Sequence, residues 1–166
     1  MKTIYLAGGC FWGCEKFFAQ FDGVVHTLVG YANGNTAAPS YEDVKHRGTG
    51  HAETVKIDFD EETISLEELL DDYFLVIDPL SVNKQGEDAG IQYRTGIYYD
   101  DGSLLPVIRE RVAREAEKYN QPLAVEVAPL ENFYPAEEYH QKYLDKNPGG
   151  YCHIPDRMMH IAKGEE

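Results

Sequence analysis

Hydrophobic and polar positions alternate along the start of this chain in a way that predicts a strand followed by a helix. Residues 3–7 are β-branched, aromatic or apolar and run into two glycines, as a buried strand does before a tight turn. The next apolar side chains fall at i, i+3, i+4 and i+7, which is one face of a helix; they are Cys14, Phe17, Phe18 and Phe21. Cys10 therefore lies at or just before the first turn of this helix.

The remaining elements follow from the same two periodicities. We expect strands over residues 24–31, 52–59, 93–99 and 123–128. We expect helices over about 65–77, 103–119 and 135–144. The first begins with a capping-box pattern, Ser65 and Glu68, and Ser103 can cap the second. Residues 32–50 are rich in Gly, Asn and Pro and predict a long connection that contains Tyr41.

The interleaving of strands and helices predicts an α+β fold. We expect a single two-layer α/β sandwich with a mixed sheet, a ferredoxin-like core and long loops, and one domain over residues 1–166, because no repeat or linker divides the chain. Gly149, Gly150 and the nearby prolines predict that the C-terminal tail, about residues 146–166, is irregular and mobile.

Composition and charge narrow the possible partners. Asp and Glu number 29 against 15 Lys and Arg, so the net charge of -14 disfavours nucleic acid and anionic membrane surfaces. No apolar run has the length of a membrane span or of a secretory signal. We expect a cytoplasmic monomer.

The three cysteines, an odd number, argue against a structural disulfide framework. The roles that remain for them are catalysis, redox sensing, metal binding or simple burial.

The position of Cys10 makes it the first candidate for thiol chemistry. Backbone N–H groups and the positive end of the dipole at a helix N-terminus favour a thiolate and can lower a cysteine pKa from about 8.5 into the ~3.5–7.5 range. Glycines on either side of GCFWG allow the backbone to approach a ligand closely. The alternative is that Cys10 is simply a small buried hydrophobic residue.

The other two cysteines differ in setting. Cys14 lies on the apolar stripe and is the better candidate for a packing residue. Residues four apart on a helix have Cβ atoms ~5–6 Å apart, whereas a disulfide needs ~3.5–4.5 Å, so a bond to Cys10 would distort the first turn. Cys152, in NPGGYCHIP, could be a resolving thiol or an incidental surface cysteine. A zinc site of Cys10, Cys14, Cys152 and His153 has unfavourable ligand spacing.

An ordered series of motifs makes the sequence specific. GGCFWGCE, PSYEDV, GTGHAE, GEDAGIQYRTGIYY, FYPAEEYHQKYL and KNPGGYC follow one another from about residue 4 to residue 152. Together they resemble the peptide methionine sulfoxide reductase A family, whose substrate is the S epimer of methionine sulfoxide, free or in peptides and proteins, and whose reductant is thioredoxin. The resemblance implies an oxidoreductase of protein repair under oxidative stress, with no cofactor and no metal.

The resemblance also implies roles for individual residues. Cys10 matches the nucleophile that becomes a sulfenic acid, and Cys152 matches the recycling cysteine that forms a disulfide with it. Phe11 and Trp12 match the aromatic walls of the methyl pocket, and Glu53 matches the acid beside the sulfoxide oxygen. Tyr41 and Tyr93 match two tyrosines that share the role of that acid, and Asp88 matches a second acidic residue of the pocket. Cys14 remains a possible secondary thiol.

The chain also departs from the family pattern. A second C-terminal cysteine, which many members have, is absent, and Lys45 stands where some members have a cysteine before GHAE. The GYCHIP ending resembles members fused to a reductase domain for the R epimer. Two rival functions remain open at this stage: a Cys/His structural zinc module, and a peptide-binding module that uses Phe11 and Trp12 without turnover.

Overall fold

The core of the fold is a sheet built from a βαββαβ unit. The computed structural model describes residues 1–163. In chain order the unit consists of β1 (Lys2–Ala7), α1 (Phe11–Ala19), β2 (Val24–Ala32), β3 (Ala52–Phe59), α3 (Leu66–Val76) and β6 (Gly96–Tyr99). Its strands lie in the order β6-β1-β3-β2, and each neighbouring pair is antiparallel. This confirms the predicted α+β fold with a ferredoxin-like core.

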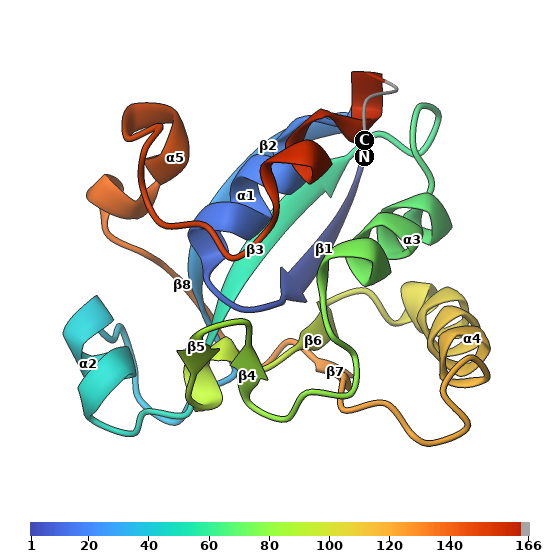
Figure 1. The fold of residues 1–166 in the computed structure, drawn as a ribbon. Coiled ribbons are helices and arrows are strands. Elements are labelled where there is room, and N and C mark those ends of the chain that lie inside the picture. The colour runs from blue at the N-terminus through green and yellow to red at the C-terminus, as the bar shows by residue number, and fades with distance from the viewer. Residues whose placement is uncertain (164–166) are drawn as a thin grey trace.

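Two short edge strands complete the sheet. β7 (Glu126–Pro129) pairs with β6 in parallel, and β8 (Phe133–Pro135) pairs with β2 antiparallel, so the six-stranded sheet is mixed, as predicted. The helices α1 and α3 lie on the same face of the sheet, where the main apolar layer forms (Figure 1).

Alternation along β1 explains why the sheet has two differently covered faces. Ile4 and Leu6 point into the main core with the helices, whereas Tyr5 and Ala7 point to a smaller cluster on the opposite face. The helices contribute four side chains with no exposed surface to the main core, Phe17, Phe18, Leu69 and Leu70. Full burial of each such side chain contributes about 1.5–3 kcal/mol, which fixes α1 firmly against the strands that carry the site.

The connections hold more regular structure than predicted. The long connection over residues 32–50 contains α2 (Tyr41–His46), which begins with a capping box formed by Ser40 and Asp43. A hairpin of β4 (Lys84–Gln85) and β5 (Asp88–Ala89) leads into a 3-10 helix, η1 (Ile91–Tyr93), and the strand predicted from residue 93 begins only at Gly96.

The last predicted helices also differ from the structure in detail. α4 (Leu105–Ala116) follows a 3-10 turn, η2 (Gly102–Leu104), whose cap is Asp101 and not Ser103. Instead of one helix over residues 135–144, the chain forms η3 (Glu138–His140) and α5 (Tyr143–Lys146). Gln141 bonds both backbone groups of Val29 and thereby extends the edge of β2, and Lys142 takes a left-handed φ of 55°. These tertiary contacts override the helical pattern.

The C-terminal segment lies along α1 and holds more regular structure than predicted, since this segment is irregular only between Lys146 and Asp156 within the described residues. Asp156–Lys163 form a 3-10 helix, η4, and Ile154 and Met159 are buried in the main core. Gln20, at the end of α1, donates to the carbonyl of Met158 at 2.8 Å and accepts from the N–H of Ala162 at 3.0 Å. The segment therefore runs beside the helix (Figure 1). Residues 164–166 of the predicted tail lie outside the described residues. Within residues 1–163, the helices are too short or too polar to span a bilayer.

Candidate active site

Cys10 is the N-cap of α1, where the sequence predicts it. Its backbone is extended (φ -62°, ψ 126°), and Gly9 before it takes a φ of 86°, which turns the chain from β1 into the helix. The thiol is buried, with 7% of the residue exposed. Burial and the neighbouring Glu53 raise its pKa well above the ordinary value, and the backbone N–H of Trp12 only partly opposes this. The expected lowering of the Cys10 pKa is therefore wrong, because desolvation outweighs the helix terminus.

Glu53 lies beside this helix terminus on β3. The N–H of Phe11 donates to its Oε1 at 3.1 Å, which joins the carboxyl group to the first residue of α1. Only 2% of Glu53 is exposed. Burial raises its pKa to about 8, while the bond from Phe11 acts in the opposite direction. Glu53 is therefore largely a neutral acid at pH 7, next to a thiol.

Three further predicted residues surround Cys10 and Glu53. Tyr41 begins α2, Tyr93 ends η1 and Asp88 lies on β5. Burial, and then the charge of Glu53, raise the pKa of Tyr41 to about 12 and raise that of Tyr93 further. The charge of Asp88 also acts on Cys10, Glu53 and Tyr93. These five residues come from five segments and influence one another's protonation. The two tyrosines keep neutral hydroxyl groups, which can donate hydrogen bonds.

Phe11 and Trp12 form an aromatic cluster at the mouth of α1, together with residues that sequence reasoning did not single out. The Trp12 indole stacks on Tyr143 with ring centroids 3.7 Å apart, and its Nε1–H donates to Nδ1 of His140 at 3.0 Å. The His140 ring also lies 5.3 Å from Phe11 and 4.6 Å from Tyr41. Phe11 itself is 1% exposed, so it supports the cluster from below and Trp12 forms its outer part.

Glu137 and His140 are functional candidates that the sequence signalled only through the motif FYPAEEYHQKYL. Glu137 accepts from the backbone N–H of Tyr41 at 3.0 Å and from the hydroxyl of Tyr31 at 2.8 Å. It thereby holds the start of α2 over the sheet. His140 is 1% exposed, and burial lowers its pKa, so the ring stays neutral and keeps Nδ1 free to accept from Trp12.

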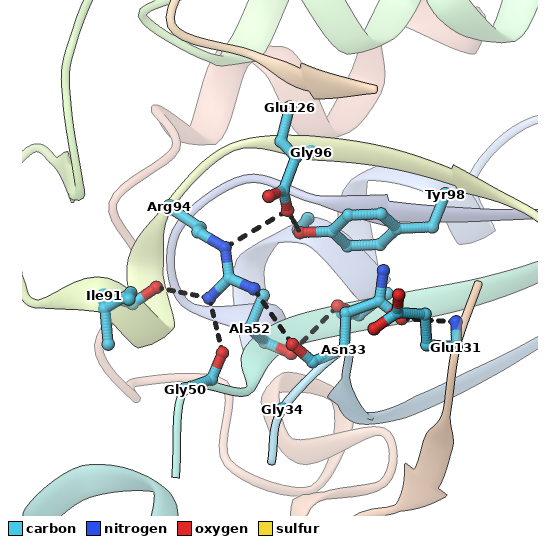
Figure 2. Close-up of polar contacts among 12 residues, drawn as sticks. Asn33, Gly34, Gly50, Ala52, Ile91, Arg94, Gly96, Tyr98, Glu126 and Glu131 are labelled. Carbon is cyan, nitrogen blue, oxygen red and sulfur yellow. Dashed lines mark hydrogen bonds and ion pairs between the residues drawn. The ribbon is translucent and has the colours of Figure 1, made fainter. Parts of the chain in front are cut away.

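Arg94 forms hydrogen bonds to both the segment that leads to Glu53 and the segment that carries Tyr93 (Figure 2). Its guanidinium donates to the carbonyls of Gly50 at 2.8 Å, Ile91 at 3.1 Å and Asn33 at 3.4 Å. Its Nε donates to Glu126 at 3.3 Å. Gly50 precedes the β3 strand of Glu53, and Ile91 begins the 3-10 helix of Tyr93. A single planar group therefore sets the spacing between these segments.

The remaining two cysteines lie at the first turns of α1, Cys14 within the helix and Cys152 packed against it. Cys14 is 3% exposed, its thiol donates to the carbonyl of Gly8 at 3.1 Å, and burial raises its pKa. Cys152 is half-buried, and its Sγ lies 3.0 Å from the point where a Cβ on Gly13 would stand. Cys152 is thus packed against the first turn of α1, close enough to Cys14 for its charge to act on that thiol, and outside the acidic group around Glu53.

Among the described residues 1–163, no three His, Cys, Asp or Glu side chains are grouped so that they could hold a metal ion. The chemistry that the arrangement offers is a buried thiol, an adjacent neutral carboxylic acid with tyrosine hydroxyls, an aromatic cluster and a second thiol packed against the first turn of α1.

Comparisons with known proteins agree on one family. The model of the family described as peptide methionine sulfoxide reductase matches residues 2–164. A relative from Lachnoclostridium phytofermentans named peptide methionine sulfoxide reductase MsrA is 61% identical, with 98% of both chains covered. The reduced form of Mxr1 from Saccharomyces cerevisiae has a TM-score of 0.86 at 40% identity, covering 91% of this chain and 88% of that one. Mxr1 in complex with Trx2 has a TM-score of 0.60 at 27% identity, covering 86% and 84%.

Proposed function

The chain belongs to the peptide methionine sulfoxide reductase A family, and from that premise we propose that it reduces methionine (S)-sulfoxide, free or in peptides and proteins, by chemistry at Cys10. The product is methionine, so the reaction repairs proteins after oxidative damage. The observation that carries the proposal is the bond between the N–H of Phe11 and Glu53 Oε1 at 3.1 Å, which fixes a neutral acid beside the N-cap thiol.

The first step transfers one oxygen atom. The Cys10 sulfur attacks the sulfoxide sulfur while Glu53, through the oxygen not engaged by Phe11, donates a proton to the departing oxygen. Tyr41 and Tyr93 stabilise that oxygen as neutral donors, and Asp88 shapes the charge around them. As the bond between the two sulfur atoms forms, the S–O bond breaks and the oxygen leaves as water, with the protons of Glu53 and of the Cys10 thiol. This water attacks the Cys10 sulfur, the S–S bond breaks, methionine leaves and the released proton returns to Glu53, so a Cys10 sulfenic acid remains. The sulfoxide sulfur is thereby reduced by two electrons and the Cys10 sulfur is oxidised by two.

The aromatic cluster suits the unreactive end of this substrate. Trp12 offers a polarisable apolar face for the S-methyl group, and contacts between sulfur and aromatic rings are favourable. The stack on Tyr143 and the bond to His140 hold that face in one orientation. Phe11 packs behind it and excludes water from the acid.

Recycling uses Cys152 in a second step. Its thiol condenses with the sulfenic acid of Cys10, which forms the disulfide and releases water. The packing of Cys152 Sγ against Gly13 supports this pairing, because Gly13 is the third residue after the N-cap. Reduction of the disulfide by a dithiol then returns both thiols. We propose thioredoxin as that dithiol, since the yeast relative forms a complex with Trx2.

The test is a single-turnover experiment with a peptide that contains methionine (S)-sulfoxide. Wild-type protein is mixed with the peptide without reductant, and the peptide and the protein thiols are followed by mass spectrometry. We expect loss of one oxygen atom from the peptide and a Cys10–Cys152 disulfide in the protein. Cys10→Ser should form no methionine. Cys152→Ser should complete one turnover but lose cycling with thioredoxin.

Cys14→Ser is the matched control, since serine also donates a hydrogen bond to Gly8, and it should keep both steps. Methionine formation by Cys10→Ser would contradict the proposal. Binding of the peptide without loss of oxygen would favour the peptide-binding function, and stoichiometric zinc with stability lost on chelation would favour the zinc module.

A further inference from the structure

His153 occupies a slot formed by three glycines around the mouth of α1. A Cβ on Gly9 would lie 2.9 Å from its Nε2, a Cβ on Gly13 would lie 3.4 Å from its Nδ1, and a Cβ on Gly86 would lie 3.5 Å from its Cβ. The imidazole therefore fills the space that side chains at these positions would take. The glycines that flank the cysteine motif make room for a residue of the chain's own C-terminal segment.

The imidazole is also fixed by a hydrogen bond. Its Nε2 lies 3.0 Å from the carbonyl oxygen of Gly8, and because a carbonyl only accepts, Nε2 carries the proton. Gly8 is the residue that connects β1 to the turn before Cys10. The bond thus joins the C-terminal segment to the backbone that positions the N-cap thiol.

The neighbours of His153 are held as well, on either side of Cys152. Tyr151 donates its hydroxyl to Asp88 Oδ2 at 3.0 Å, at an exposed position. Ile154 is 3% exposed and packs into the main core. Of these anchors, the His153 bond is the polar one that is partly buried, and it is adjacent to the recycling thiol. A hydrogen bond shielded from water is worth more than an exposed one.

We propose that His153 is a positioning residue for disulfide formation: its imidazole docks the segment of Cys152 onto the first turn of α1 and keeps the recycling thiol close to Cys10. This role rests on the proposed function. Docking raises the effective concentration of the Cys152 thiol at the sulfenic acid. A docked thiol needs only a local movement to reach the sulfenic acid, whereas an undocked segment must find it by diffusion. Cys152 has one restraint to break, the bond from its Sγ to the carbonyl of Ile154 at 3.3 Å.

The experiment separates the two steps of one turnover. Reduced wild type, His153→Ala and His153→Gln are mixed with one equivalent of a methionine (S)-sulfoxide peptide, quenched by alkylation at increasing times, and analysed for methionine and for the Cys10–Cys152 disulfide. In His153→Ala we expect methionine to form at the wild-type rate and the disulfide to form roughly 10–100-fold more slowly. His153→Gln, whose amide can donate to Gly8 in the same way, should recover most of the disulfide rate.

His160→Ala is the matched control, because it removes a partly exposed histidine from the same segment and should change neither rate. Wild-type disulfide formation in His153→Ala would overturn the proposal, and so would an equal slowing of both steps or failure of His153→Gln to restore the rate. If wild type itself forms no methionine or no disulfide, the proposed function is wrong. If wild type forms both and His153→Ala behaves alike, only the docking role is wrong.

Discussion

At the residue scale, Cys10 shows how burial changes a conclusion drawn from local sequence. The strand, the glycines and the apolar stripe place it correctly at the N-cap of α1. Its pKa could not be predicted in the same way, because the dominant influences are desolvation and a carboxyl group 43 positions further along the chain. Nearby residues set the backbone of a site, whereas its protonation states depend on contacts between distant segments.

Glu53 gives a prediction at this scale. A carboxyl whose pKa rises from its ordinary value of 4.5 to about 8 on folding keeps its proton in the native state at pH values where the unfolded chain has already lost it. Stability is therefore highest below that unfolded value and falls as pH rises toward 8. At pH 8 we expect Glu53→Gln to raise the free energy of unfolding by roughly 2–5 kcal/mol, since one pKa unit is worth about 1.4 kcal/mol.

Urea denaturation at about pH 4, 6 and 8 measures this difference. The gain should shrink toward zero at the lowest pH, where Glu53 is protonated in both states. A gain that does not depend on pH would contradict a neutral buried acid. Glu131→Gln, at an exposed loop position, is the control.

At the scale of elements, long periodic segments were predictable and short ones were not. The apolar stripes of α1 and α3 and the alternation of β3 identify these elements because each buries one whole face. α2, η1 and α5 have too few residues for a stripe and take their shape from tertiary hydrogen bonds, such as those of Glu137, Gln141 and Arg94. The candidate residues of the site were predicted through motifs, but the segments that carry Tyr41 and Tyr93 were expected to be loop and strand.

Arg94 allows a test of how these short elements are held. In Arg94→Lys the charge remains but the planar fork is lost, so the carbonyls of Gly50, Ile91 and Asn33 cannot all be satisfied. We expect the free energy of unfolding to fall by about 1–3 kcal/mol and the first-turnover rate to fall with it. Denaturant titration and quenched-flow mass spectrometry measure the two. Arg47→Lys, whose partner Asp43 is at the surface, should change neither, and equal effects of both variants would contradict the role of Arg94.

At the scale of the whole molecule, a fold of ordinary topology carries a strongly acidic surface. The net charge of -14 disfavours the compact state through repulsion at neutral pH. Topology, predicted from the sequence, does not depend on this charge, since both faces of the sheet are covered by apolar clusters.

Repulsion among these charges predicts a salt dependence. An increase in ionic strength from about 10 mM to about 0.1 M shortens the screening length from about 30 Å to about 10 Å, so the melting temperature at pH 7 should rise. Differential scanning fluorimetry measures it. Near pH 4.7, the pI of the sequence, the same change should have little effect, and an equal rise at both pH values would point to a cause other than net charge.

The carbonyl of Gly8 has a consequence for the protein under an excess of peroxide. It accepts from the Cys14 thiol at 3.1 Å as well as from His153 at 3.0 Å, and burial raises the pKa of Cys14. Oxidation of cysteine proceeds through the thiolate, so a sulfur that keeps its proton bonded inside an apolar stripe is spared. Exposure also governs oxidation, so we expect damage to begin at the half-buried Cys152 and to leave the buried Cys14 reduced. An enzyme that acts on oxidised sulfur thus shields one sulfur of its own, one helical turn away from the reaction.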